Sequence, residues 1–266
     1  YLRVGRGLSL HIAPSNISAN ALYTFAFGLL SGSPSIIRLS KKNIDELSEI
    51  LEMINFIFKK DCFVELSKKF SFITYEHETN LNNYFSSLTA SRVIWGGDET
   101  IKIFKSLNTN PDCIDMVFPN KLSSSIISSG WLINAIKSDV KNQAELFARD
   151  IGLFSQMACS SPNSLILLKD NNLPYKEALL NFLEDCDSAL DKKVWLSDNH
   201  SLSNFKSSVD ICMELSSSKC IYKGRNLSVF FIEKNNSINS EDLKLKDSCL
   251  FLYEVNSLSE VSSLLA

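Results

Sequence analysis

Apolar residues in the first half of the chain alternate between continuous runs and runs with helical spacing. The continuous runs, which are typical of buried strands, lie at residues 8–13, 35–39, 70–74 and 92–95. The segments with helical spacing lie at residues 17–32, 43–59, 81–90 and from about 98. Gly32 is a typical helix end, and Asn43 with Glu46 forms a capping-box pattern that predicts the start of the next helix. Strands that alternate with helices predict a parallel sheet covered on both faces.

The pattern restarts near Asn120, which we take as the start of a second unit. Helices are expected at residues 131–151, 175–190 and 204–215, with a short last helix capped at Ser257. Strands are expected at residues 164–168, 227–232 and 250–255. The residues 234–246, which are rich in Ser, Asn and Lys, predict an exposed loop. We therefore expect two α/β domains, residues 1–119 and residues 120–266.

Three turns follow predicted strands of the first domain, at residues 14–18, 38–41 and 96–98. Parallel α/β sheets bind ligands at the carboxyl ends of their strands, so these turns are candidate binding sites. Gly96 and Gly97 lie between a strand and a helix start, where backbone N–H groups and the helix dipole would hold a pyrophosphate. The alternative is a plain turn. The usual dinucleotide signature has three glycines and follows a strand. Here Gly5 and Gly7 have no third glycine at the required spacing, and they precede a strand instead of following one.

Cys159 lies in a short loop of small residues between a predicted helix and a predicted strand. Small neighbours leave room for a substrate, and a reactive thiol needs both access and a stabilised thiolate. A lone cysteine is more often a small residue of the core. The local sequence leaves both interpretations open.

Composition narrows the classes of function. The 266 residues carry a formal net charge of -3 and 45% hydrophobic residues, which describes a globular protein and gives no reason to expect nucleic acid as a partner. No apolar run reaches the roughly 20 residues of a membrane span, and no secretory leader is visible. The seven cysteines show no paired spacing, which favours free thiols in the cytoplasm. The three histidines lie far apart in the sequence, which gives no reason to expect a metal site.

Four blocks of sequence stand out along the chain. They read Gly-Leu-Ser-Leu-His-Ile-Ala-Pro-Ser-Asn-Ile-Ser (residues 7–18), Gly-Leu-Leu-Ser-Gly-Ser-Pro-Ser-Ile-Ile-Arg-Leu-Ser (28–40), Val-Ile-Trp-Gly-Gly-Asp-Glu-Thr (93–100) and Phe-Ser-Gln-Met-Ala-Cys-Ser-Ser-Pro (154–162). In this order they resemble the LuxC-type acyl-CoA reductases, the fatty-acid reductases known from bacterial bioluminescence and their relatives. More distantly they are similar to the aldehyde dehydrogenase superfamily. The resemblance implies an aldehyde-dehydrogenase-like α/β fold, with a Rossmann-type cofactor-binding domain and a catalytic domain that bears the cysteine.

Carried over by position, Cys159 resembles the nucleophile of the family. Asn16 matches the amide that helps to form the oxyanion hole, with the backbone N–H of Cys159 as the other donor. Another interpretation of Asn16 is a helix N-cap, because a helix is predicted directly after it. Ser15, Gly96 and Gly97 fall in the blocks that resemble the cofactor-binding segments.

Two basic residues bear on the choice of cofactor. Arg38 stands where the superfamily has a lysine that contacts the adenosine ribose, and Lys41 stands where NAD-preferring relatives have a glutamate. A base in place of an acid at that position favours a 2′-phosphate, so the resemblance implies NADPH. The alternative is that Lys41 and Lys42 belong to a solvated loop.

Two features of the superfamily are missing from the sequence. Hydrolytic aldehyde dehydrogenases have a glutamate upstream of the cysteine loop as base for the deacylating water, and residues 117–144 contain no glutamate. The Glu-x-Phe-Gly-Pro block, which meets the nicotinamide ribose, should fall near residues 244–248, where the chain reads Lys-Leu-Lys-Asp-Ser. The first absence favours the CoA-linked branch, and the second contact cannot be carried over.

The resemblance thus implies NADPH-dependent reduction of an acyl-CoA to the aldehyde through an acyl-cysteine. The alternatives are an NAD(P)-dependent aldehyde dehydrogenase and a non-catalytic homologue that acts as a binding partner. An acyl-protein synthetase or transferase and a second copy of the chain are candidate partners. Both ends are expected to be cut short relative to the family, at the C-terminal end of the catalytic domain in particular.

Overall fold

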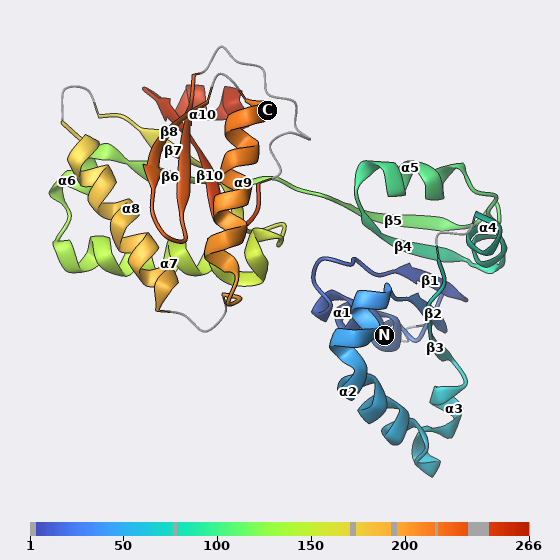
Figure 1. The fold of residues 1–266 in the computed structure, drawn as a ribbon. Helices are drawn as coiled ribbons and strands as arrows, with labels where there is room; N and C mark the ends of the chain where they lie inside the picture. The colour runs from blue at the N-terminus through green and yellow to red at the C-terminus, as the bar shows by residue number, and fades with distance from the viewer. Residues whose placement is uncertain are drawn as a thin grey trace. The chain divides into compact units, whose positions relative to one another are not determined.

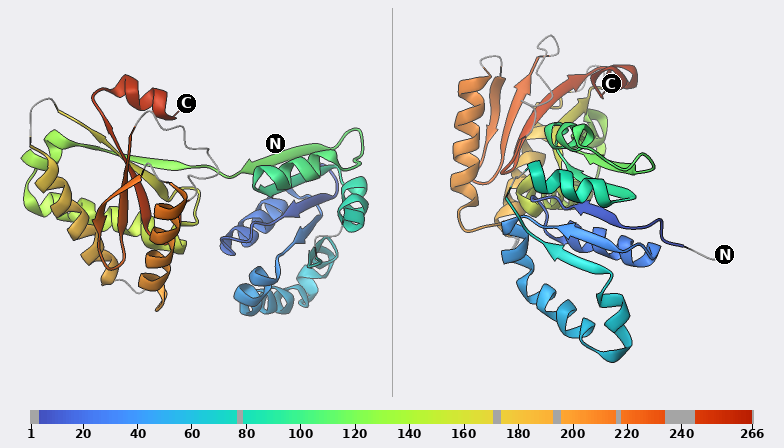
Figure 2. Two further views of the ribbon diagram at one scale, coloured as in Figure 1. Left: turned by 45° about the horizontal axis from the view of Figure 1, so that its top comes forward. Right: turned by 90° about the vertical axis from the view of Figure 1, so that its right-hand side faces the viewer.

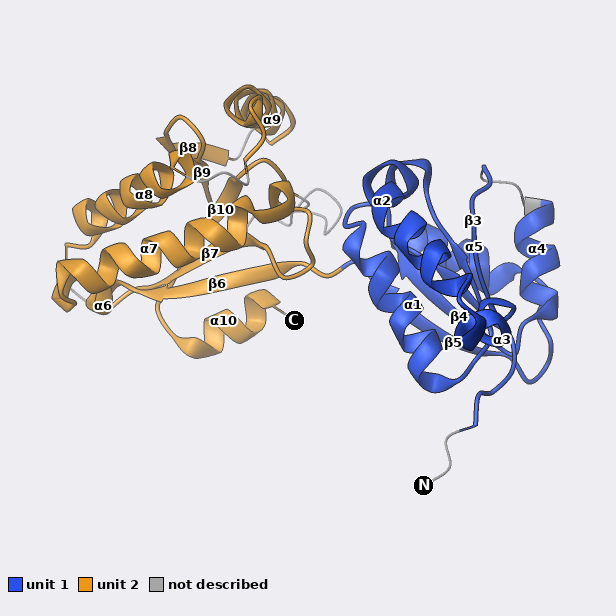
Figure 3. Ribbon diagram, turned by 90° about the horizontal axis from the view of Figure 1, so that it is seen from below, with its two compact units in different colours: residues 1–120 blue, residues 121–266 orange. Residues whose placement is uncertain are grey.

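The structure is a computed structural model, and it describes residues 4–76, 79–170, 174–192, 196–215, 218–233 and 245–265. The chain divides into two compact units, Tyr1–Asn120 and Lys121–Ala266 (Figure 3). Each unit holds one sheet of five strands, and each is described by itself below.

The sheet of the first unit is parallel throughout, in the order β3-β2-β1-β4-β5. Its strands are β1 (Ser9–Ile12), β2 (Ser35–Arg38), β3 (Phe70–Ile73), β4 (Ser91–Gly96) and β5 (Ile114–Pro119). Its helices are α1 (Ala19–Ser31), α2 (Lys41–Phe58), the 3-10 helix η1 (Asp61–Phe63), α3 (Val64–Ser67), α4 (Thr79–Leu88) and α5 (Asp98–Ser106) (Figure 1).

Both faces of this sheet are covered, as alternation along β2 shows. Ile37 packs in a cluster with Phe25 of α1 and Leu47 of α2. Its neighbour Ile36 packs against a different cluster, which contains Phe104 of α5. Adjacent residues of a strand point to opposite faces, so α1 and α2 cover one face and α5 covers the other. This is the doubly wound arrangement that the alternating pattern predicts.

The sheet of the second unit has the order β6-β7-β10-β9-β8, and only its edge strand β8 runs antiparallel to its neighbour. The strands are β6 (Ser123–Ser128), β7 (Pro162–Leu168), β8 (Ser218–Lys223), β9 (Ser228–Ile232) and β10 (Cys249–Val255). The helices are α6 (Ser129–Asn134), α7 (Lys137–Gly152), the 3-10 helix η2 (Leu153–Gln156), α8 (Lys176–Asp191), α9 (His200–Glu214) and α10 (Leu258–Leu265) (Figure 2).

The core of the second unit is also split by its sheet. Val229 of β9 packs with Phe147 of α7 and Phe182 of α8. Its neighbour Phe230 packs with Ile211 of α9. Helices therefore cover both sides of β9. This explains why the sequence of the strand is a continuous apolar run.

Several elements differ from the sequence-based expectations. Helix α2 begins at Lys41 with Ser40 as its N-cap, and Asn43 completes that capping box instead of starting the helix, so the predicted cap was wrong. The long helix expected over residues 131–151 is two helices, α6 and α7, separated at Ala135 and Ile136. Three strands, β5, β6 and β8, were not predicted. Of the expected loop at residues 234–246, residues 234–244 lie outside the described part, and Leu245 is buried.

Two of the predicted helix boundaries are present, the end of α1 at its C-cap Gly32 and the start of α10 directly after Ser257. Gly32 ends α1 with φ 72°, a left-handed conformation that glycine adopts at little cost. The Ser257 hydroxyl accepts a hydrogen bond from the Glu260 N–H at 3.3 Å at the start of α10. Among the described residues, none of the helices is long and apolar enough to cross a membrane.

Burial of His11 makes stability sensitive to mild acid. The side chain is 3% exposed, and its Nδ1 shares a hydrogen bond of 2.6 Å with the Thr24 hydroxyl. Burial lowers the pKa of His11 from 6.5 to about 4. Unfolding restores the ordinary pKa, so the unfolded chain binds more protons below pH 6.5. The folding stability that depends on a neutral His11 is therefore fully present above pH 6.5 and is lost as the pH falls toward 4.

We expect this histidine to remove about 3 kcal/mol of unfolding free energy between neutral pH and pH 4. Urea unfolding at a series of pH values would measure the loss. The His11→Gln variant keeps a polar group for Thr24 but does not titrate, so its stability should fall less steeply over the same range. Identical slopes in the two proteins would contradict the assignment.

Candidate active site

The turn after β1 presents Ser15 and Asn16. Ser15 is exposed and Asn16 is partly buried. The Asn16 side-chain oxygen accepts a hydrogen bond from the Ile17 N–H at 3.0 Å. Helix α1 begins at Ala19, and Ser18 occupies its N-cap position, so Asn16 lies before the cap and the N-cap interpretation of Asn16 is wrong.

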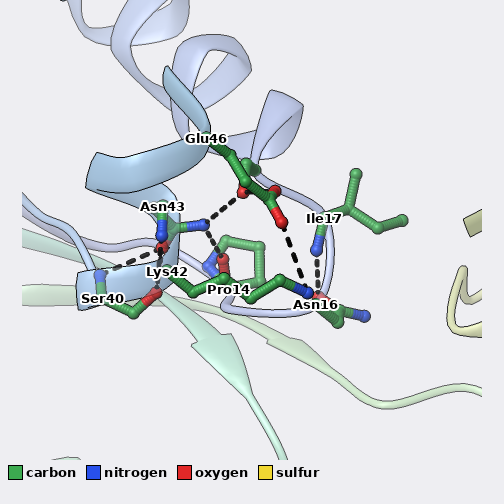
Figure 4. Close-up of polar contacts among 8 residues, drawn as sticks. Pro14, Asn16, Ile17, Ser40, Lys42, Asn43 and Glu46 are labelled. Carbon is green, nitrogen blue, oxygen red and sulfur yellow. Dashed lines mark hydrogen bonds and ion pairs between the residues drawn. The ribbon is translucent and has the colours of Figure 1, made fainter. Parts of the chain in front are cut away.

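Asn43 ties this turn to the turn after β2 (Figure 4). Its side chain is fully buried, and its amide nitrogen donates to the Pro14 carbonyl at 3.1 Å and to the Ser18 hydroxyl at 3.0 Å. Its amide oxygen accepts from the Ser40 N–H at 3.0 Å. The carboxyl ends of β1 and β2 are therefore held together by one side chain, which the sequence had suggested only as a helix cap.

The three basic residues at the second turn differ in their surroundings. A guanidinium nitrogen of Arg38 donates to the Tyr75 carbonyl at 3.1 Å, and its central carbon lies 5.3 Å from the centre of the Tyr75 ring. Lys42 forms an ion pair of 3.7 Å with Glu46. Lys41, the first residue of α2, is exposed, and among the described residues it has no ion-pair partner. Among the described basic residues of this turn, Lys41 is thus the one that is available for an external anion.

Gly96 and Gly97 join β4 to α5. A β-carbon on Gly96 would lie 2.9 Å from the Thr100 side chain, so close approach of the chain requires glycine there. Gly97 is the N-cap residue of α5. The first turn of this helix also carries Asp98 and Glu99, whose carboxylates already compensate the positive end of the helix dipole and oppose a further anion. The charge at this turn is less favourable for a phosphate than the sequence alone suggested.

Cys159 lies in the second unit, between η2 and β7. Its side chain is exposed, and its carbonyl accepts a hydrogen bond of 2.6 Å from the Ser123 hydroxyl at the start of β6. In the described part of the chain no acceptor is recorded for its backbone N–H. The thiol is therefore accessible to a reagent, and the adjacent N–H is available to an oxyanion.

The structure brings the candidate residues of the first unit to one edge of its sheet. Asn16, Arg38 and Gly96 all follow or end strands that are neighbours in the order β2-β1-β4. That edge is the carboxyl end of parallel strands, where such sheets bind ligands. Cys159 belongs to the other unit, where its loop precedes a strand.

Both described histidines, His11 and His200, are buried. Burial lowers the pKa of His11, and burial also lowers the pKa of His200. His77 lies outside the described residues. In the described ranges no three His, Cys, Asp or Glu side chains gather as a metal site would require.

Comparison with known proteins identifies the family of the chain. Residues 2–204 match the model of the family described as acyl-CoA reductase (LuxC). The chain belongs to the LuxC acyl-CoA reductase family. No curated protein sequence matches it significantly.

Solved structures of aldehyde dehydrogenases share the fold of this LuxC family member. Lactaldehyde dehydrogenase from Escherichia coli matches 98% of the chain with a TM-score of 0.67 at 11% identity, and the match covers 55% of that protein. An NAD-dependent benzaldehyde dehydrogenase from Corynebacterium glutamicum matches 98% with a TM-score of 0.68 at 14% identity, over 56% of its length. The bifunctional proline utilization A protein matches equally well at 11% identity, over 26% of its length. The chain therefore has the aldehyde-dehydrogenase-like fold and spans about half, or less, of these proteins.

Replacement of Asn43 by aspartate should destabilise this LuxC family member. Aspartate keeps the acceptor for Ser40 but loses both donated hydrogen bonds and places a carboxylate against the Pro14 carbonyl. We expect a loss of about 1–3 kcal/mol of unfolding free energy, measured from urea midpoints. Asn55→Asp is the matched control, because it makes the same chemical change at an exposed position of the same helix. Equal midpoints for the two variants would show that Asn43 does not bind the turns together.

Proposed function

We propose that the protein reduces an acyl-CoA, or another acyl thioester, to the aldehyde with NADPH through an acyl-cysteine at Cys159. The proposal rests on the exposure and hydrogen bonding of Cys159, which lies within the segment matched to the LuxC family. Its side chain is exposed, its carbonyl is held by Ser123, and no described acceptor takes its N–H. An accessible thiol beside a free backbone donor suits attack on a thioester carbonyl.

In the proposed reaction the Cys159 thiolate attacks the acyl carbonyl carbon. The negative charge that develops on the carbonyl oxygen would be stabilised by the backbone N–H of Cys159, and the resemblance to the family assigns the side-chain amide of Asn16 as the second donor. The carbon–sulfur bond to CoA then breaks, CoA leaves as its thiolate, and the acyl group remains on Cys159 as a thioester. Bound NADPH would supply the hydride that reduces this thioester. The absence of a glutamate from residues 117–144 disfavours loss of the acyl group to water.

The residues of the first unit fit a phosphorylated dinucleotide. Lys41, which is exposed and has no ion-pair partner among the described residues, would bind the 2′-phosphate, and Arg38 would lie along the adenosine ribose. Ser15 and the closely packed turn at Gly96 and Gly97 would border the rest of the nucleotide. The benzaldehyde dehydrogenase with the same fold is described as NAD-dependent. Lys41 is the observation that favours NADPH for this chain instead.

The proposed division of labour follows the two units. Residues 1–119 would bind the cofactor, and residues 120–266 would carry the acyl group. Because an acyl-cysteine can receive its acyl group from another thioester, an acyl-protein synthetase or transferase is the proposed protein partner, and a homo-oligomer is proposed for the assembly. Both would act in the cytoplasm.

A turnover assay with acyl-CoA substrates of several chain lengths tests the proposal. The expected result is NADPH oxidation that requires acyl-CoA, with stoichiometric release of aldehyde and free CoA. Oxidation of aldehydes to acids without acyl-CoA reduction would instead identify an aldehyde dehydrogenase. A folded protein that neither turns over nor binds NADPH would favour a non-catalytic binding partner.

A further inference from the structure

Three consecutive residues just before the Cys159 loop have left-handed backbone conformations. They are Phe154, Ser155 and Gln156, with φ values of 55°, 50° and 63°. Residues with a β-carbon rarely adopt this region, because the β-carbon crowds the following carbonyl. Such a run persists only where the surrounding structure enforces it, and such runs concentrate at functional sites.

The side chain of Gln156 supplies that enforcement. It is 3% exposed, and its amide nitrogen donates to two backbone carbonyls, that of Pro162 and that of Cys249, both at 2.8 Å. Pro162 is the first residue of β7, and Cys249 is the first residue of β10. One side chain therefore closes the loop of residues 157–161 on itself and fastens it to the neighbouring strand of the sheet.

A second contact holds the same segment. The Asp247 N–H donates to the Ser155 carbonyl at 3.3 Å, and Asp247 and Ser248 are themselves left-handed, with φ values of 57° and 59°. The segment that precedes Cys159 is thus hydrogen-bonded to a second turn whose backbone is also strained. On the other side of the loop the Ser123 hydroxyl fixes the Cys159 carbonyl. The loop has little freedom to change the direction of the thiol or of the adjacent N–H.

We propose that Gln156 is a positioning residue for Cys159. By bonding Pro162 and Cys249 it holds the left-handed run that sets the direction of the thiol and the oxyanion donor toward the acyl carbonyl. This inference rests on the proposed acyl transfer to Cys159. Gln156 touches no reacting atom, so its effect is on the alignment of the attack. Misplacement of a nucleophile by about 1 Å is enough to slow a reaction about 100-fold.

Gln156→Gly and Gln156→Met are the variants that test it. Glycine accepts a φ of 63° without steric cost, so Gln156→Gly removes both hydrogen bonds while the backbone can keep its course. Gln156→Met keeps the volume of the side chain without its donors, and serves where the glycine variant folds poorly. Ser155→Gly is the matched control, because it relieves the same backbone strain at a position that records no side-chain hydrogen bond among the described residues.

Two rates are measured on each protein: single-turnover formation of the acyl adduct from acyl-CoA, and alkylation of Cys159 by iodoacetamide, followed by peptide mass spectrometry. Alkylation requires an exposed thiol that can ionise but no alignment with an acyl carbonyl, whereas acylation also requires that alignment. We expect the Gln156 variants to acylate about 10- to 100-fold more slowly, with alkylation and NADPH binding close to wild type. Ser155→Gly should acylate like the wild type.

Acylation at the wild-type rate in both Gln156 variants would overturn the positioning role. So would a parallel fall in acylation and alkylation, because that result indicates a general loss of structure. A wild-type protein that forms no acyl adduct overturns the proposed function and this inference with it. An active wild type with unaffected variants overturns the inference alone.

Discussion

Cys159→Ala is expected to lower the rate of acyl-CoA reduction by at least about 1,000-fold, because removal of a nucleophile leaves only binding and oxyanion stabilisation. The exposed side chain makes this substitution tolerable for folding, since little apolar area is lost from the core. NADPH binding, measured by titration of its fluorescence, should remain at the wild-type affinity because the proposed cofactor residues lie in the other unit.

Cys212→Ala provides the matched control for that experiment. Cys212 is also an exposed free thiol of the second unit, on α9, but it lies outside the segment that resembles the family's cysteine loop. It should retain full activity. Substantial reductase activity in Cys159→Ala, or an equal loss in Cys212→Ala, would refute the assignment of Cys159.

Lys41→Gln should have the second largest effect, and it should act on one cofactor only. Loss of this exposed cation would remove the proposed charge-assisted contact to the 2′-phosphate, and such a contact is worth about 1.5–3 kcal/mol. The dissociation constant for NADPH should therefore rise about 10- to 100-fold, while that for NADH, which has no 2′-phosphate, should hardly change. Calorimetric titration of both cofactors measures the two constants.

Lys42→Gln is the control at the adjacent position. Its ammonium group is paired with Glu46, so its removal should leave the NADPH dissociation constant close to wild type. Equal weakening of NADPH in the two variants would indicate a diffuse positive potential rather than a phosphate contact at Lys41. If NADPH binds both variants as tightly as the wild type, the proposed role of Lys41 at the 2′-phosphate has no support.

The buried strands and the positions of the candidate turns that follow them could be predicted from the sequence. Strands that are covered on both faces, such as β1 and β9, appear as unbroken apolar runs. The missed strands are edge strands. In β5 the exposed residues Ile114, Met116 and Phe118 alternate with less exposed ones, and β8 mixes polar and apolar residues without a clear period. Edge strands depend on pairing partners that a single segment does not reveal.

Other misses have a tertiary cause. The break between α6 and α7 has neither glycine nor proline, and the alanine at 135 is a good helix former. The role of Asn43 depends on residues 25 and 29 positions away, Ser18 and Pro14, which meet only in the folded sheet. The left-handed run before Cys159 gives no sequence signal, since Phe154 and Ser155 are not residues that favour positive φ.

The candidate site residues were suggested by their place in ordered blocks of the sequence. Block order suggested Cys159 and Asn16, but the local residues could not distinguish an exposed thiol from a buried one. The exposure of Cys159, and the lack of an ion-pair partner for Lys41 among the residues that the structure describes, come from the structure. The acidic first turn of α5 was visible in the sequence at Asp98 and Glu99, and its bearing on phosphate binding follows once the helix is known to begin there.

Intact-mass spectrometry after mixing the protein with a medium-chain acyl-CoA tests the central claim most directly. We expect a mass increase of one acyl group in the wild type, none in Cys159→Ala, and loss of the adduct with release of aldehyde when NADPH is added. Absence of any adduct across a range of chain lengths, in a folded protein that also fails to bind NADPH, would contradict it.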